Sequence, residues 1–238
     1  DGLTINSLSS DAAVTVSTAG DTTATSITAG GDVALTVTGA DSDLSVGSIT
    51  AADQAITLTV GGVITDGDAA SDLSASSLNI TAAGVGSSTD ALDTTVGSVT
   101  VSSTGGVYLN ETDGVTISID ADGVVSLNTG GDTTVSSITA GDDVDVTTAG
   151  DLTVTDITAD GQAVSLNVSG DIVRGQDATN VTATSLDISA SSSVGAAAAL
   201  QTAVDNLDIV SSGVVNVDEV DGLTINSLSS DAAVTVST

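Results

Sequence analysis

The chain has 238 residues, and its 32 acidic side chains against one basic side chain, Arg174, give it a formal net charge of −31. Nucleic acid is excluded as a partner, because phosphate backbones are bound by clustered Lys and Arg. The chain contains no His, Cys or Lys. The usual nucleophile–base pairs are therefore missing, and we expect a non-enzymatic protein that requires no cofactor.

The sequence repeats on two long scales. Residues 1–18 return letter for letter as residues 221–238, a period of 220. Each period divides again, since DGLTI at 1–5 resembles DGVTI at 113–117, and residues 62–67 resemble residues 170–175. We therefore predict half-repeats over 1–112 and 113–220, with 221–238 opening the next copy. We expect further copies to follow end to end, as in repeat proteins whose units bury their apolar faces against neighbours. Lateral self-association of identical chains is the second partner interaction that the sequence leaves open.

A shorter period lies inside each half-repeat. Pairs of apolar residues two positions apart recur at nearly equal intervals, at Val125/Leu127, Val144/Val146 and Val164/Leu166. Val and Thr favour strands, and the absence of Pro suits strands that donate every backbone N–H. These features predict an all-β fold, a right-handed parallel β-helix (β-solenoid) with about 20 residues per coil. About eleven coils stacked roughly 4.8 Å apart would make a rod of about 50 Å.

Four stretches interrupt the alternation, and we predict them to be longer loops: 66–75, 83–95, 174–183 and 191–203. In the last of these, Leu200 begins a helical spacing with Val204 and Leu207. A helical turn is therefore expected near residues 196–203. No run of 18 apolar residues occurs anywhere, so we expect no membrane insertion.

Aspartates recur at the predicted corners, next to Gly. If the coils are in register, Asp132, Asp151 and Asp171 lie above one another about 5 Å apart, where two charges repel by about 0.8 kcal/mol in water. A bridging Ca²⁺ would relieve this repulsion, and Asp120 and Asp122 form a further oxygen-rich corner. These five aspartates are the predicted metal ligands. The alternative is that each is a turn residue that accepts backbone hydrogen bonds.

Threonine triplets such as Thr57-Leu58-Thr59 resemble the flat arrays of ice-binding solenoids. They do not recur at every coil in the sequence, so a continuous face is not expected from them. Ordinary strand threonine is the simpler interpretation.

The run GVGSSTDALDTTVGSVTVSSTGGVYLNETDGVTI (84–117) resembles the repeat region of filamentous-haemagglutinin-type bacterial adhesins. Residues 192–225 form a looser copy, with Asn216 in place of Tyr108. This resemblance implies coils of a parallel β-helix exported to the cell surface, where they form a stalk. We therefore expect a structural segment of an extracellular fibre, acting as a stiff acidic spacer. The alternative is a module that binds carbohydrate, mineral or ice through an exposed Thr/Asp face.

Overall fold

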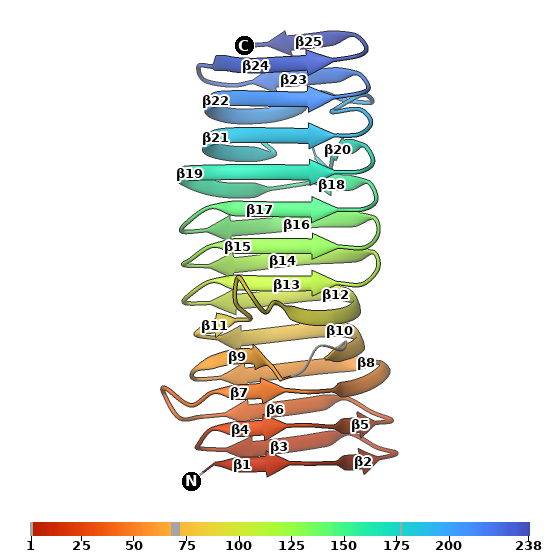
Figure 1. Cartoon of the computed structure of the whole chain (residues 1–238), viewed down its shortest axis with the longest axis vertical. Coiled ribbons are helices and arrows are strands. Elements are labelled where there is room, and N and C mark those ends of the chain that lie inside the picture. The colour runs from red at the N-terminus through yellow and green to blue at the C-terminus, as the bar shows by residue number, and fades with distance from the viewer. Residues whose placement is uncertain (1, 68–71, 177) are drawn as a thin grey trace. The chain divides into compact units, whose positions relative to one another are not determined.

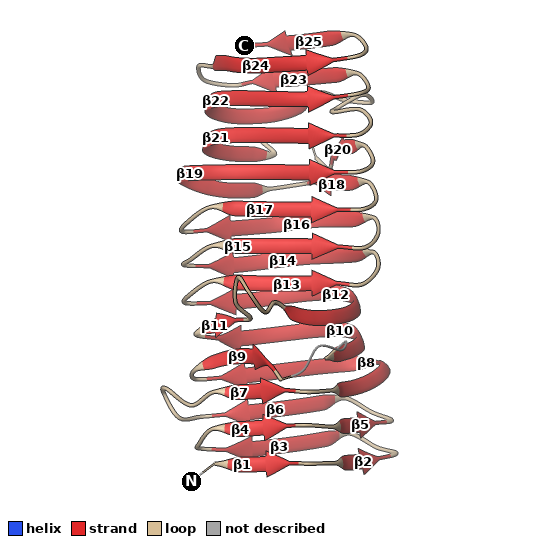
Figure 2. Cartoon of the chain, in the orientation of Figure 1, coloured by secondary structure: helices blue, strands red, loops and turns tan. Residues whose placement is uncertain are grey.

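The computed structural model describes residues 2–67, 72–176 and 178–238, and the elements in these ranges are all β-strands (Figure 2). The chain forms two compact units. Unit 1 comprises residues 1–113 with 121–123, and unit 2 comprises residues 114–120 with 124–238. Parts of the predicted loops 66–75 and 174–183, and Asp1, lie outside the described residues.

The strands are labelled in Figure 1. Those of unit 1 are β1 Leu3–Ile5, β2 Leu8–Ser10, β3 Val14–Thr18, β4 Thr22–Ala24, β5 Ile27–Ala29, β6 Val33–Val37, β7 Leu44–Val46, β8 Ile49–Val60, β9 Val63–Asp66, β10 Leu73–Ala82, β11 Gly84–Val85, β12 Leu92–Ser103 and β13 Val107–Glu111. From β14 onward they are β14 Val115–Ala121, β15 Val125–Thr129, β16 Thr133–Ala140, β17 Val144–Thr148, β18 Leu152–Val154, β19 Ile157–Val168, β20 Ile172–Arg174, β21 Val181–Ala190, β22 Leu200–Ser211, β23 Val215–Glu219, β24 Thr224–Ser230 and β25 Val234–Ser237.

Each turn of unit 2 contributes to three parallel ladders. The first joins residues 133–135, 152–154 and 172–174, and the second joins 138–139, 157–159 and 181–183. The third runs through 125–129, 144–148, 164–168, 186–190 and 207–211. Because each strand donates to the strand one turn away, the hydrogen bonds connect successive coils.

Unit 1 is built in the same way. Its first ladder joins residues 3–5, 22–24, 44–46 and 64–66, and its second joins 8–10, 27–29, 49–51 and 73–75. Its third ladder runs through 14–18, 33–37, 56–60, 77–82 and 98–103. The predicted parallel β-solenoid with about 20 residues per turn is therefore confirmed.

The core of each unit is a set of stacked apolar columns. Successive side chains alternate between the two faces of a strand, so one residue in two points inward. In unit 2 the column that starts at Val125 continues through Val144, Val164, Leu186 and Leu207, all at most 1 % exposed. Small branched residues fill the interior without large aromatics, as the composition predicted.

The prediction of a helical turn at 196–203 is wrong. β22 begins at Leu200, which together with Thr202 and Val204 is buried at alternate positions, as a strand requires. All four predicted loops are also too long, because strands begin inside them. β10 begins at Leu73, β12 at Leu92, β21 at Val181 and β22 at Leu200. Val204 and Leu207 are both buried although they are three residues apart, because a corner of the coil lies between them and interrupts the alternation. This interruption produced the apparent helical spacing in the sequence.

Candidate functional site

The aspartates predicted to stack in unit 2 form a ladder of side-chain to backbone hydrogen bonds. The Asp132 carboxylate accepts the backbone N–H of Asp151 at 2.9 Å, and that of Asp151 accepts the N–H of Asp171 at 2.8 Å. Asp171 then accepts the N–H of Ser193 at 2.7 Å and the Ser192 hydroxyl at 2.6 Å. The Ser192 hydroxyl, followed by the Ser193 N–H, lowers the pKa of Asp171.

Unit 1 repeats this arrangement at positions that the sequence analysis did not single out. The Asp21 carboxylate accepts the N–H of Asp43 at 3.2 Å, and the Asp43 carboxylate accepts the N–H of Val63 at 2.9 Å. Asp32 does the same for the N–H of Ala55 at 3.0 Å. The Gly-Asp step at Asp21 and Asp32 was the signal that could have revealed these two positions, whereas Asp43 follows Ser42.

Asp120 and Asp122 lie outside this ladder of hydrogen bonds. Asp120 is an exposed residue of β14 in unit 2, and Asp122 is an exposed residue of unit 1 whose N–H donates to the carbonyl of Ser103 at 3.1 Å. Among the residues that the structure describes, no three His, Cys, Asp or Glu side chains converge on a point where they could hold a metal ion. Calcium binding by the five aspartates stays a prediction, whereas the alternative role as acceptors of backbone N–H groups is observed for three of them.

The sequence analysis missed a pair of buried carboxyl groups. The chain has only two glutamates, Glu111 and Glu219, which occupy equivalent positions near the ends of the two predicted half-repeats and are each 2 % exposed. Each ends a short strand and pairs with a threonine of the neighbouring coil, Thr94 for Glu111 and Thr202 for Glu219. The rarity of Glu and its recurrence at the half-repeat spacing could have identified this pair.

The two glutamates make matching hydrogen bonds. Thr94 Oγ1 donates to Glu111 at 2.6 Å, and the backbone N–H of Val96 donates to it at 3.0 Å. Thr202 Oγ1 likewise donates to Glu219 at 2.6 Å. Desolvation by burial raises the pKa of both glutamates, although these donors oppose the shift. Each carboxyl group therefore joins two coils at a corner, beneath the surface.

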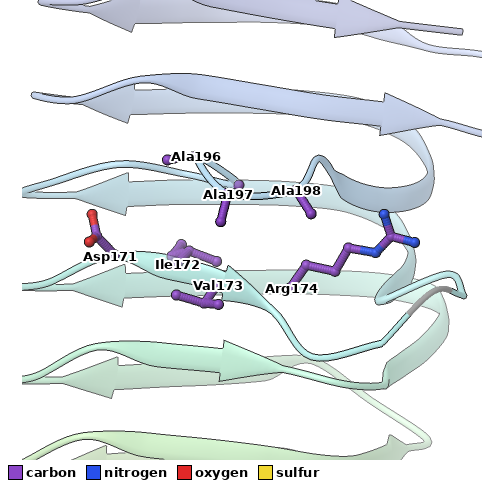
Figure 3. A pocket seen from close by; sticks show the side chains of 8 residues that line it. Asp171, Ile172, Val173, Arg174, Ala196, Ala197 and Ala198 are labelled. Carbon is purple, nitrogen blue, oxygen red and sulfur yellow. The ribbon is translucent and has the colours of Figure 1, made fainter.

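The sole basic side chain lies beside a shallow hollow of unit 2. The hollow has a volume of about 110 Å³ and lies between β20 and the loop Gly195–Ala198 (Figure 3). Arg174 donates from Nε to the carbonyl of Gln176 at 2.7 Å and from Nη1 to that of Ala199 at 3.4 Å. Pockets for small molecules are usually roughly 300–1,000 Å³, so this hollow is too small for most ligands. Arg174 therefore connects the loop that follows β20 with the loop that precedes β22.

Comparison with known proteins gave no match to a family model, to a curated protein or to a solved structure. In the described part of the chain, no helix is long and apolar enough to cross a membrane.

Proposed function

We propose that this chain is a structural repeat segment of an extracellular fibre or adhesin stalk, in which the coils act as a stiff acidic spacer. The observation that carries the proposal is the continuous set of ladders in each unit. Within the described part of each unit, successive coils are hydrogen-bonded through three ladders, and buried Val, Leu and Ile side chains stack between them. Bending such a stack would require breaking several ladder bonds and opening the apolar columns.

The chemistry of the side chains favours a spacer over an enzyme. The carboxylates of the aspartate ladder are engaged with backbone N–H groups, and the two buried glutamates bond to neighbouring coils. We therefore assign no catalytic residue and no cofactor. The carboxylates that face water keep a long fibre soluble, because net charge far from zero opposes association.

The remaining features of the proposal follow from the sequence pattern. The 220-residue period supports end-to-end continuation with further copies, in half-repeats over 1–112 and 113–220. A right-handed coil is proposed because parallel crossovers are right-handed in about 98% of cases. The resemblance of residues 84–117 to adhesin repeats supports a location at the cell surface. Calcium at the stacked aspartates would stiffen the stalk further.

Small-angle scattering on chains that carry one, two and three copies of the 220-residue period tests the spacer role. A stiff spacer requires the maximum dimension to grow by a constant increment per copy, about 50 Å for eleven coils. Growth that falls off with copy number, as for a flexible chain, would refute the proposal. Antibody labelling of intact cells of the source organism tests the location separately.

A further inference from the structure

The third ladder of unit 1 presents an outward face without charge. On five successive strands, β3, β6, β8, β10 and β12, the registered pairs place two outward residues per coil side by side. One column contains Thr15, Ala34, Thr57, Asn79 and Thr100, and the other contains Ser17, Thr36, Thr59, Thr81 and Ser102. We call these ten residues the hydroxyl face. All are exposed or half-exposed.

The register shows a continuous face of small, uncharged residues, although a Thr-x-Thr triplet occurs on only one of its five strands, as the sequence predicted. The outward positions are unevenly spaced along the chain because the turns differ in length, and the step from Val14 to Val33 is shorter than the step from Val33 to Ile56. The extra residues of the longer turns lie between the strands, so the pairing of residues within the ladder is kept. The rows are therefore continuous in space, although they are uneven in sequence.

The equivalent ladder of unit 2 provides a contrast within the same chain. Its outward positions include three carboxylates in one column, Asp145, Asp187 and Asp208. A chain of net charge −31 therefore keeps one of these two faces neutral. This difference in charge argues for a neutral ligand on the hydroxyl face.

Four candidate ligands fit a neutral polar face to different degrees. Polysaccharide sites normally include aromatic side chains that pack against the ligand, and this face contains none. A second copy of the chain would bring two acidic molecules together, with no large apolar side chain at the contact. Mineral surfaces require charge. An ordered water lattice requires only a flat, regular array of hydroxyl and methyl groups.

The spacing supports the water lattice. Successive coils are about 4.8 Å apart. In tetrahedrally bonded water with O···O distances of about 2.75 Å, second-neighbour oxygens are about 4.5 Å apart. Along the strand, outward residues are about 6.6 Å apart, and the lattice repeat in the perpendicular direction is about 7.3 Å. The first mismatch of about 0.3 Å per coil sums to about 1.2 Å over the four steps between five coils. The second mismatch does not accumulate, since the face is only two residues wide. Six of the ten residues are threonines, whose branched Cβ limits χ1 and so fixes the hydroxyl and methyl positions.

We infer that the hydroxyl face of unit 1 is an ice-binding surface. Its threonine hydroxyl and methyl groups order a layer of water that joins the lattice of an ice crystal. This activity goes beyond the spacer role and does not depend on it.

The test is partition of the whole chain into a slowly growing ice front, followed by ice-crystal shaping under a microscope. The wild-type chain is expected to enter the ice and to shape the crystals. A chain with Thr57→Tyr and Thr59→Tyr should be excluded, because two rings lift the face away from the lattice. The matched control carries Ser165→Tyr and Asn167→Tyr at the equivalent ladder of unit 2 and should enter the ice like the wild type.

Circular dichroism confirms folding of each variant, and the smaller change Thr59→Val with Thr81→Val provides a second test with less risk to the fold. That variant should lose part of the ice partition. Exclusion of the folded wild-type chain from ice would overturn the inference, as would equal partition of the two double-tyrosine variants. Retention on cellulose or chitin that depends on Thr57 and Thr59, without ice binding, would assign the face to polysaccharide. Dimerisation through the face in sedimentation, without ice binding, would assign it to self-association.

Discussion

Asp53 is the one non-glycine residue with positive φ in the described part of the chain, at 61°. It lies in a corner of β8 where the register with β10 shifts between Ala51 and Ala55, so extra residues must turn sharply. Its counterpart in the second half-repeat is Gly161, with φ of 78° in the equivalent corner of β19. The same backbone conformation is thus occupied once by Asp and once by Gly.

Replacing Asp53 by Gly should stabilise unit 1. The left-handed conformation costs an L-residue roughly 1 kcal/mol, partly offset for Asp by its local hydrogen bonding. We expect Asp53→Gly to raise the melting temperature by about 1–4 °C, measured by calorimetry. Gly161→Ala is the reciprocal control and should lower it. A fall in melting temperature for Asp53→Gly would mean that the aspartate stabilises the corner in another way.

The two buried glutamates make stability depend on pH. Their pKa is raised above the ordinary value, so the folded state favours the protonated carboxyl group. Protonation of these glutamates therefore stabilises the fold fully at pH values below their pKa in the unfolded chain. This stabilisation is lost as the pH rises through their pKa in the folded state. Asp171 acts in the opposite direction, because the Ser192 hydroxyl and the Ser193 N–H lower its pKa.

The variant Glu111→Gln isolates this effect. Its stability relative to wild type should improve as pH rises from about 4 to 7, because only the wild-type side chain ionises. We expect a relative gain of a few degrees in melting temperature over that range, since about 1 kcal/mol corresponds to roughly 2–4 °C for a chain of this size. Asp93→Asn, a change at a half-exposed position of the same strand pair, serves as the control. A pH-independent difference between Glu111→Gln and wild type would contradict the burial argument.

At the scale of elements, the aspartate ladder separates the role of charge from that of hydrogen bonding. Asp151→Asn keeps an oxygen that can accept the N–H of Asp171 and removes one charge from the stack, so it should be as stable as wild type or more stable. Asp151→Ala loses the acceptor and should cost about 1 kcal/mol, or about 2–4 °C in melting temperature.

Asp151→Asn and Asp151→Ala also test whether the stacked aspartates bind calcium. If Ca²⁺ bridges the stack, it should raise the melting temperature of the wild type, and both variants should respond less. A wild-type melting temperature that is unchanged between calcium and a chelator would remove the calcium prediction and leave the hydrogen-bonding role.

How far the sequence predicted these elements depends on the length of each strand. Where a strand has five residues with inward positions at each end, as in β15 and β17, the period-2 pattern located it correctly. Where a strand continues through a corner, the phase changes and the pattern misleads, as at Leu200 to Leu207. The aspartates could be predicted as corner residues, but their acceptor role depends on register. The buried Glu111 was missed because charge alone suggested an exposed side chain.

On the scale of the whole molecule, the predicted half-repeat and the coil do not share a common period. Within unit 2, Val125 lies in the third ladder, whereas Val234, a counterpart in the repeat, pairs with Val215 in the column that continues to Val194 and Ile172 of the first ladder. A half-repeat therefore does not contain a whole number of turns. Within unit 2, the sequence-equivalent outward residues Ser126 and Thr235 occupy different ladders, so alignment of the repeats alone cannot predict a surface column.

The net charge of −31 makes salt a strong variable for this chain. Exposed carboxylates repel one another more in the folded coils, where they are held close together, than in the expanded unfolded chain. The Debye length falls from about 30 Å at 0.01 M salt to about 8 Å at 0.15 M, which screens most of this repulsion.

We therefore expect the melting temperature to rise by several degrees when NaCl is raised from about 10 to 150 mM, and to change less beyond that range. Choline chloride at the same ionic strength is the control for specific sodium binding and should act equally. Calcium chloride matched in ionic strength should exceed both salts only if the stacked aspartates bind the ion. A melting temperature that is insensitive to all three salts would mean that hydrogen bonds to backbone N–H groups, rather than counter-ions, already offset the repulsion among the stacked carboxylates.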